Sequence, residues 1–397
     1  MTNKNSYDVI VVGGSIAGST AGYILSKLGL DVLIIDKEKF PRKKLCGGIV
    51  TLKTLHLLNK IYGETYSSLK QKKILDYITN DYEITYRMRR SILKTTSKYP
   101  YIFVDRTVYD NFLLQKAKDI GTEVIEGQFV KSVDLDECTV SLSDGTSFNA
   151  NFIIGADGAN SVVRREFNRK GLVSKKQWNH NLGTGLEIFV DRKDVGKNDF
   201  KHPILALGLV KWGYAWMFPN KDKLVIGLGA LNRKNKGNFV NALHDWVSCL
   251  NINSNSLEKT YGHPVPYGNF KFKPSYKGKV LLIGDAGGFV CTLFGEGLYL
   301  GMKTAEFAAT AIYNNINDNK AIEESYLWNL KKKVYPDLEA AMTLRFFFFN
   351  KIFSAFECKL TRVLVKKTED LIMELMSGER SPKWFKKRNL NLLKVLE

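Results

Sequence analysis

The chain has 397 residues, of which 44% are hydrophobic, so it can bury a large core, and a disordered chain is excluded. Lys and Arg number 59 against 40 Asp and Glu, and the net charge of +19 favours partners that carry phosphate, with a merely basic soluble surface as the alternative. The five cysteines form no CxxC pair and the five histidines show no spacing typical of metal ligands, so we expect neither a disulfide framework nor a metal site. Scattered cysteines fit the reducing cytoplasm, and we also expect a monomer.

The first elements in chain order predict a strand–helix–strand unit. Tyr7–Val12 has the pattern of a buried strand, Ala17–Leu28 that of a helix ended by Gly29, and Val32–Asp36 that of a second buried strand. Such a βαβ unit implies a parallel sheet. The early strand predicts no signal peptide, and the lack of an apolar run of about 18 residues predicts no membrane span.

In the middle of the chain, apolar and polar side chains alternate with a period of two residues. Residues 76–104 alternate apolar and polar side chains, which indicates an antiparallel excursion. From Gly183 to Ala230 the pattern predicts an antiparallel meander that covers a substrate. The remaining elements expected in this part are the helices Lys53–Asn59 and Val108–Ile120 and the strands Glu123–Glu126, Phe152–Gly155, Gly185–Val190, Ile204–Val210, Tyr214–Phe218 and Leu224–Leu228.

The last part of the chain again has the pattern of buried strands and helices seen at the N-terminus. Phe239–Leu250 is predicted as a helix, Lys279–Ile283 as a buried strand and Gly297–Tyr313 as a long helix, with mostly helix after Asn317. Because the late strand resembles the first ones, we expect an α/β fold in which two lobes are interleaved. We assign residues 1–75, 101–170 and 275–318 to a discontinuous Rossmann-type dinucleotide-binding domain, 76–100 and 171–274 to an antiparallel-sheet substrate domain, and 319–397 to a helical C-terminal region.

A glycine-rich turn joins the first strand to the first helix. Gly13 permits the tight turn, Gly18 lets the helix pack close to the strand, and the helix N-terminus offers free N–H groups to a diphosphate. Asp36, at the end of the second strand, can accept hydrogen bonds from ribose hydroxyls. The expected cofactor contacts here are Gly13, Ser15, Ile16, Ala17, Gly18, Asp36 and Lys37.

Two further motifs follow strand ends. The segment from Gly155 to Ser161 contains Asp157, and Gly284-Asp285-Ala286-Gly287-Gly288 precedes Gly295-Glu296-Gly297 at a helix start. A carboxylate at such a strand end can hold ribityl hydroxyls, and a positive helix end can stabilise an anionic reduced flavin.

These three motifs, in this order, resemble the FAD proteins built like para-hydroxybenzoate hydroxylase. The resemblance spans about residues 7–320 and implies an FAD-binding domain. It implies that Asp285 contacts the ribityl chain, that Asp157 is mostly structural near the diphosphate, and that Arg106 lies at the flavin. It also implies that Val130 contacts adenine and that Gly295, Gly297 and Leu298 approach the isoalloxazine.

Two segments are similar to those of geranylgeranyl reductases. These are Cys46-Gly47-Gly48, after Phe40-Pro41, and the aromatic segment Gly213–Pro219, which contains Tyr214 and Trp216. The resemblance implies an FAD-dependent oxidoreductase that reduces C=C bonds of prenyl chains in a lipid or isoprenoid. Tyr214 and Trp216 then line the substrate tunnel or are plain core residues, and Cys46 either donates a proton or orders substrate, or packs a turn beside the FAD.

Several alternatives remain open at this point. An NAD(P)H-dependent flavin monooxygenase, a hydroxylase or epoxidase, has the same three motifs, and a non-catalytic flavin-binding protein is a third possibility. Only one dinucleotide fingerprint is visible, so the electrons are expected from transient NAD(P)H or from another redox protein. Cys291-Thr292 replaces the family's Asn-Pro, and proline normally stiffens that loop against the flavin.

The C-terminal part contains an aromatic and basic stretch. Leu344–Phe356 is too short to span a membrane but can lie in an interface, with a buried helix at the substrate mouth as the alternative. The basic residues that would then face anionic lipid are Lys359, Arg362, Lys366, Lys367 and the cluster 383–388. No nucleic-acid module is recognisable, so no nucleic-acid partner is expected.

Overall fold

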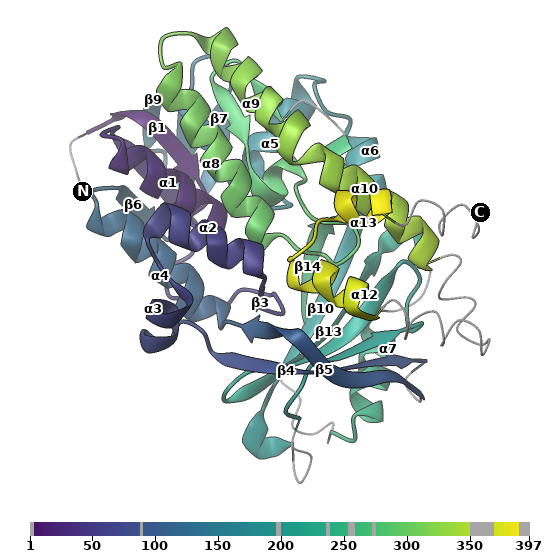
Figure 1. Cartoon of the computed structure of the whole chain (residues 1–397). Coiled ribbons are helices and arrows are strands. Elements are labelled where there is room, and N and C mark those ends of the chain that lie inside the picture. The colour runs from purple at the N-terminus through teal and green to yellow at the C-terminus, as the bar shows by residue number, and fades with distance from the viewer. Residues whose placement is uncertain are drawn as a thin grey trace.

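The computed structural model describes residues 4–87, 90–195, 200–235, 239–252, 259–271, 275–349 and 369–388. It contains two sheets, each with helices packed against it (Figure 1). The predicted α/β class is confirmed, with segments far apart in the sequence meeting in the first sheet.

The first sheet has the strand order β15-β16-β9-β1-β2-β6, with a β7–β8 hairpin attached to β9. Strands β16, β9, β1, β2 and β6 run parallel. Their near-continuous Val, Ile and Leu runs suit strands that are covered on both faces. The bounds are β1 Ser6–Val12, β2 Val32–Asp36, β6 Glu123–Glu126, β7 Val130–Asp134, β8 Thr139–Leu142, β9 Ser147–Gly155, β15 Tyr276–Lys277 and β16 Val280–Leu282.

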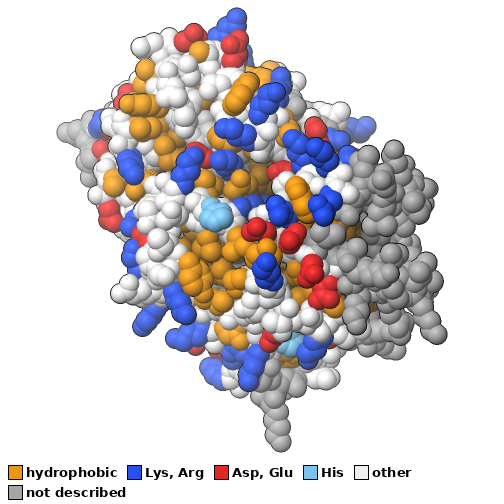
Figure 2. Space-filling model, viewed as in Figure 1, with side chains coloured by type: hydrophobic (Ala, Val, Ile, Leu, Met, Phe, Trp, Pro, Cys, Tyr) orange, Lys and Arg blue, Asp and Glu red, His pale blue; other side chains and the backbone are white. Residues whose placement is uncertain are grey.

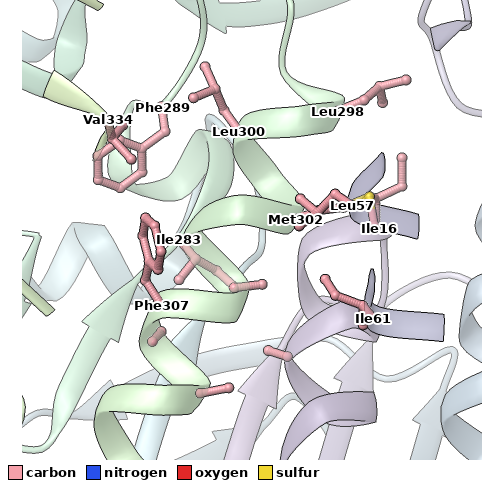
Figure 3. Packing of buried hydrophobic residues seen from close by; sticks show 14 of the residues in the cluster. Ile16, Leu57, Ile61, Ile283, Phe289, Leu298, Leu300, Met302, Phe307 and Val334 are labelled. Atoms are coloured by element: carbon pink, nitrogen blue, oxygen red, sulfur yellow. The ribbon is translucent and has the colours of Figure 1, made fainter. Parts of the chain in front are cut away.

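One helical layer on this sheet contains α1 (Ile16–Lys27), α4 (Arg106–Asp119) and α8 (Leu298–Asn314). Helix α1 contacts both α4 and α8, and α8 contacts α9 (Asn319–Lys333). Figure 3 shows Ile16 of α1, Leu57 of α2 and Met302 of α8 converging in this core. The packing holds the N-termini of α1 and α8 beside the same strand ends. The other helices over this part are α2 Leu52–Tyr62, α3 Tyr66–Gln71, α5 Val162–Arg169 and α6 Lys175–His180.

The second sheet has the order β14-β10-β13-β12-β11-β4-β5-β3. Helix α7 (Phe239–Cys249) covers one of its faces, where Trp246 is buried and its Nε1 donates to the Trp216 carbonyl at 3.0 Å. The opposite face is therefore left to face the first sheet. The bounds are β3 Ile49–Val50, β4 Tyr77–Tyr86, β5 Arg90–Phe103, β10 Leu182–Asp191, β11 Ile204–Leu207, β12 Gly213–Pro219, β13 Lys223–Leu231 and β14 Tyr261–Pro266.

One expectation about the strands needs correction, and one hairpin was missed. Strands β11, β12 and β13 form the predicted meander, but β10 pairs with β13 and β14 and not with β11. Strand β11 pairs instead with β4, in parallel, so the excursion of residues 76–104 belongs to this same sheet. The β7–β8 hairpin was not predicted, because its strands are short and mix buried residues with partly and fully exposed ones.

The C-terminal region is helical where it is described. It comprises α9, α10 (Tyr335–Phe347), α12 (Glu369–Ser377) and α13 (Pro382–Arg388), and α13 packs on α10. Leu344 and Phe347 are buried and Phe346 is about half exposed, whereas residues 350–356, with Lys359, Arg362, Lys366 and Lys367, lie outside the described residues. Within the part that the structure describes, no helix is long and apolar enough to cross a membrane.

Candidate active site

A cavity of about 940 Å³ lies where the two sheets face each other. One wall consists of the carboxyl ends of β1, β2 and β9, and the other consists of side chains of β10, β12 and β13. Ligands of open parallel sheets bind at this edge, and the volume is at the upper end of the usual range for ligand pockets, about 300–1,000 Å³. The cavity is therefore the candidate site.

The glycine turn at the start of α1 is closely packed. Gly13 has φ +104°, and a Cβ there would lie 2.6 Å from the Ala156 carbonyl oxygen, so only glycine lets this turn touch the second motif. A Cβ on Gly18 would lie 1.7 Å from the Gly13 oxygen. Ser15 begins the helix without capping it, which leaves the first N–H groups of α1 free to bind a diphosphate.

Asp36 holds this turn in place. Its Oδ2 accepts the Gly14 N–H at 2.6 Å and its Oδ1 accepts the Glu38 N–H at 2.9 Å. Each carboxylate oxygen can accept a second hydrogen bond, so Asp36 can position the turn and still bind ribose hydroxyls. Lys37 lines the cavity beside it.

A buried charge network lies beneath the turn. Arg106 binds Asp110 through Nε at 2.7 Å and Nη2 at 3.0 Å, and Arg42 reaches the same carboxylate at 3.0 Å. The Ser15 hydroxyl donates to Asp110 at 2.9 Å. Burial alone would raise the pKa of Asp110, but the charges of Arg106 and Arg42 and the bonds from Arg106 hold that pKa below its ordinary value. Asp110 thus stays ionised and fixes both arginines near the diphosphate position.

Asp285 follows β16 and points into the cavity. A Cβ on Gly297 would lie 3.3 Å from its Oδ1, so the glycine at the start of α8 leaves this carboxylate room. Burial raises the pKa of Asp285, and the charges of Lys44 and Arg106 oppose that shift. A hydroxyl donor such as a ribityl chain would compensate the buried carboxylate.

The loop before α8 is held by hydrogen bonds at the place where the pattern that the sequence resembles has proline. The Tyr214 hydroxyl donates to the Phe294 carbonyl at 2.6 Å, and Cys291 N–H donates to the Glu296 carbonyl at 2.9 Å. The Glu296 carboxylate pairs with Lys53 at 2.5 Å and accepts the Thr51 hydroxyl at 2.9 Å. These contacts supply the rigidity that Thr292 cannot.

We expect Tyr214→Phe to loosen this loop while leaving the ring in place. The loss of one hydrogen bond should lower the free energy of unfolding by about 1 kcal/mol and weaken FAD binding. Thermal unfolding and FAD titration measure both effects. Tyr313→Phe, at an exposed tyrosine on α8, is the control, and equal behaviour of the two variants would contradict the assignment.

Cys46, Gly47 and Gly48 also line the cavity. The Gly48 N–H approaches the Cys46 sulfur at 3.5 Å. Cys46 is also near the Arg106 guanidinium, whose pKa it helps to raise, and near Glu187 of β10. Burial raises the pKa of Glu187 to about 8, against the opposing effects of Cys46 and Arg106.

One part of the cavity lining is apolar, and we call it the apolar arm. Its lining comes from the second sheet and from the C-terminal helices, which lie against each other in Figure 1. The residues are Ile84, Tyr101, Leu205, Leu207, Phe348, Phe349, Leu375, Met376 and Phe385. This arm can bury a long hydrocarbon chain.

The structure brings almost all the predicted site residues together. Those that line the cavity are Gly13, Ser15, Ile16, Ala17, Asp36, Lys37, Cys46, Gly47, Gly48, Arg106, Val130, Asp157, Tyr214, Trp216, Asp285, Gly295, Gly297 and Leu298. Gly18 lies behind them and packs the helix, as its predicted role requires. Their contacts with a cofactor stay a prediction.

Sequence reasoning missed Asp110, Glu187 and the apolar arm. The spacing of Arg106 and Asp110 by four residues in a helix was a usable signal for an ion pair. Glu187 interrupts a run of apolar residues in a buried strand, which is also unusual. The arm had no local signal, because its residues come from six separate segments.

The residues present fit FAD. Among the described residues, Asp157 Oδ1 and Arg42 Nη1 are buried beside the cavity without a hydrogen-bond partner. The other oxygen of Asp157, Oδ2, accepts the Val162 N–H at the start of α5 at 2.6 Å. Gly13, the free N-terminus of α1, Asp36 and Asp285 all line the same cavity, and they offer the groups that bind a diphosphate, a ribose and a ribityl chain.

Comparison with known proteins agrees with this fit. An FAD binding domain family matches residues 6–184. An uncharacterised protein of Methanosarcina barkeri is 31% identical over 89% of this chain and 86% of its own. Geranylgeranyl diphosphate reductase of Synechocystis is 26% identical, covering 79% and 77%, and digeranylgeranylglycerophospholipid reductase of Methanococcus vannielii is 25% identical, covering 84% and 85%.

Solved structures share the fold. A geranylgeranyl bacteriochlorophyll reductase-like protein from Thermoplasma acidophilum superposes with a TM-score of 0.71 at 19% identity, covering 93% of this chain and 100% of its own. The flavin-dependent brominase Bmp2 gives 0.71 at 18% identity, covering 98% and 99%. Because proteins of different chemistry share this fold, the fold alone does not select the reaction.

Proposed function

Because the chain belongs to the geranylgeranyl reductase family of FAD-dependent oxidoreductases, we propose that it reduces C=C bonds of a prenyl chain in an isoprenoid or lipid. The proposal depends on one observation. The apolar arm and the glycine motifs line one and the same cavity. A substrate chain lying in the arm reaches the residues around Cys46. When bound, reduced FAD supplies a hydride there.

A prenyl chain offers almost only apolar area for recognition. Burial of that area contributes about 25 cal/mol per Å², so a long arm binds a long chain tightly without polar contacts. The aromatic and aliphatic walls also exclude water from the reacting double bond. The headgroup stays outside the arm, which suits a diphosphate or a lipid equally.

Helix α13 supports a peripheral contact with anionic lipid. Phe385 lines the cavity, while Lys383, Lys387 and Arg388 of the same helix are exposed. A lipid-borne substrate could thus pass from a membrane surface into the arm beside a basic helix. Figure 2 shows Lys and Arg side chains spread over the whole visible face, so the electrostatic attraction is not restricted to this helix.

The electron donor is proposed to be NAD(P)H, binding transiently, or another redox protein. The test of function therefore supplies electrons chemically. Protein with FAD is reduced by dithionite without oxygen and mixed with geranylgeranyl diphosphate or a digeranylgeranylglycerophospholipid. A mass gain of two hydrogens per reduced bond is expected, and unchanged masses for both substrates would exclude the proposal.

The arm itself can be tested by obstruction. Leu207→Trp narrows the arm and should raise KM for a geranylgeranyl substrate about tenfold, with FAD content unchanged. Val108→Trp, at an exposed position of α4, is the matched control. Steady-state kinetics of both variants measure KM. An unchanged KM in Leu207→Trp would show that the prenyl chain of the substrate binds outside the apolar arm.

The alternative is an NAD(P)H-dependent monooxygenase, since the fold is shared with other flavin enzymes. It predicts a different product from the same incubation in air. Gain of an oxygen atom together with substrate-stimulated NAD(P)H oxidation would favour this alternative over reduction.

A further inference from the structure

Glu187 is a carboxyl group that no cofactor motif accounts for. It lies in the middle of β10 with 3% of its surface exposed, and it lines the cavity beside Cys46. Its neighbour across the sheet is Gly227, and a Cβ there would lie 2.5 Å from the Trp216 ring. The indole therefore lies over Gly227, next to Glu187, and the carboxyl is enclosed on the sheet side.

One oxygen of this carboxyl is free for a ligand. The backbone N–H of Cys46 lies near enough to oppose the rise in the pKa of Glu187, and the Oε2 of Glu187 is buried without a hydrogen-bond partner among the described residues. Leaving a buried polar atom unpaired is costly, so such an atom in a binding cavity indicates a reacting or bound group. The Trp216 Nε1 and His263 Nε2 atoms are unpartnered in the same cavity, which places the unmet hydrogen bonds together.

The charged and titratable groups around Glu187 come from several elements. They are Lys44 and Cys46 from the loop after β2, Arg106 of α4, Tyr214 of β12, and Tyr261 and His263 of β14. Burial, with the charges of Lys44 and Arg106, lowers the pKa of His263 to about 3, so this ring is neutral and carries no extra proton at pH 7. The Tyr214 hydroxyl is already bound to Phe294.

Glu187 differs from these neighbours in its protonation. Burial raises the pKa of Glu187 to about 8, while the Cys46 N–H and the Arg106 charge oppose the shift. The carboxyl is therefore mostly neutral at pH 7 and holds a transferable proton inside the cavity, as raised-pKa general acids do.

We propose that Glu187 is the acid that protonates the substrate carbon when the prenyl double bond is reduced. This role rests on the proposed function. As a hydride arrives at one carbon, the π bond breaks and its electron pair forms a C–H bond with the Glu187 proton at the other carbon. Both added hydrogens and both electrons are thereby accounted for. The carboxylate that remains faces Arg106 and regains its proton from water after product leaves.

The test compares Glu187→Gln with wild type as proteins that contain FAD. Glutamine keeps an acceptor for the Cys46 N–H but has no proton to give. Each protein is reduced by dithionite without oxygen and mixed with geranylgeranyl diphosphate, and flavin reoxidation is followed from pH 6 to 10. The wild-type rate should fall about tenfold per pH unit above about 8, because the acid form is lost as pH rises through the pKa.

The variant should be about 100-fold slower, with no such pH dependence. Glu187→Asp, which restores an acid, should recover part of the rate, and Glu83→Gln on β4, whose carboxylate pairs with His202 outside the cavity, should behave as wild type. A Glu187→Gln rate near that of wild type, with the same pH profile, would overturn the assignment.

Infrared spectra separate this inference from the proposed function, since they need no substrate. A protonated-carboxyl band that fades as pH rises through about 8, and that Glu187→Gln lacks, is expected. Its absence from wild type would overturn the role of Glu187. A wild type that shows the band but reduces no prenyl chain would contradict the proposed function instead.

Discussion

Asp110→Asn is expected to lower the free energy of unfolding by about 3 kcal/mol. The substitution leaves Arg106 and Arg42 buried without their counter-charge, which costs more than the pair contributes when complete. Chemical denaturation of wild type and variant at pH 7 measures the difference. A loss below about 1 kcal/mol would show that the two arginines find other partners.

The same variant should show a defined pH dependence. The folded state holds the pKa of Asp110 below its ordinary value, so its contribution to stability is present above the unfolded pKa of about 4 and is lost as pH falls through the lowered one. The difference between wild type and Asp110→Asn should therefore shrink in acid. Glu166→Gln, which breaks an exposed pair with Arg169, is the control, expected to cost less than about 1 kcal/mol.

Asp285→Ala is expected to weaken FAD binding about 100-fold. The reason is the loss of hydrogen bonds from ribityl hydroxyls to a buried carboxylate, each contributing about 1.5–3 kcal/mol. Titration of the FAD-free protein, followed by flavin fluorescence, gives the affinity.

The prediction for Asp285→Ala is checked by a control variant and by a stability measurement. Asp119→Ala, at the exposed end of α4, removes the same charge far from the cavity and should bind FAD as wild type does. Because burial raises the pKa of Asp285, removal of this carboxylate should not destabilise the FAD-free protein. Equal FAD affinity in the two variants would place the ribityl chain away from Asp285.

The loop before α8 is held in shape by contacts other than a proline. Thr292 stands where the related pattern has proline, and its side chain is fully buried. Tyr214, expected as a substrate contact, instead donates its hydroxyl to the Phe294 carbonyl of this loop while its ring still lines the cavity. One tyrosine thus links the shape of the loop to the wall of the substrate arm.

The elements with strong local patterns were predictable. Val32–Asp36 and Glu123–Glu126 have the predicted bounds, and the helix of Ala17–Leu28 differs by one residue at each end. Apolar runs, a glycine turn and a helical spacing of apolar residues are local signals. The strands that neighbour these elements in the sheet follow from the rule that consecutive strands joined by a helix lie parallel and close together. The β7–β8 hairpin and the position of β10 depend on contacts with distant strands, for which the chain has no local signal.

Local sequence was enough to identify the glycine turns, the carboxylates Asp36 and Asp285, and the segment Cys46-Gly47-Gly48, because each depends on residues that are close neighbours in the chain. The surroundings of these residues depend on the tertiary fold. The fold placed Asp110 between two arginines, brought Glu187 of β10 next to Cys46 of the loop after β2, and built an apolar arm from segments as distant as Ile84 and Phe385. Burial and charge proximity set the chemistry of these groups, and both arise from contacts between residues far apart in the sequence.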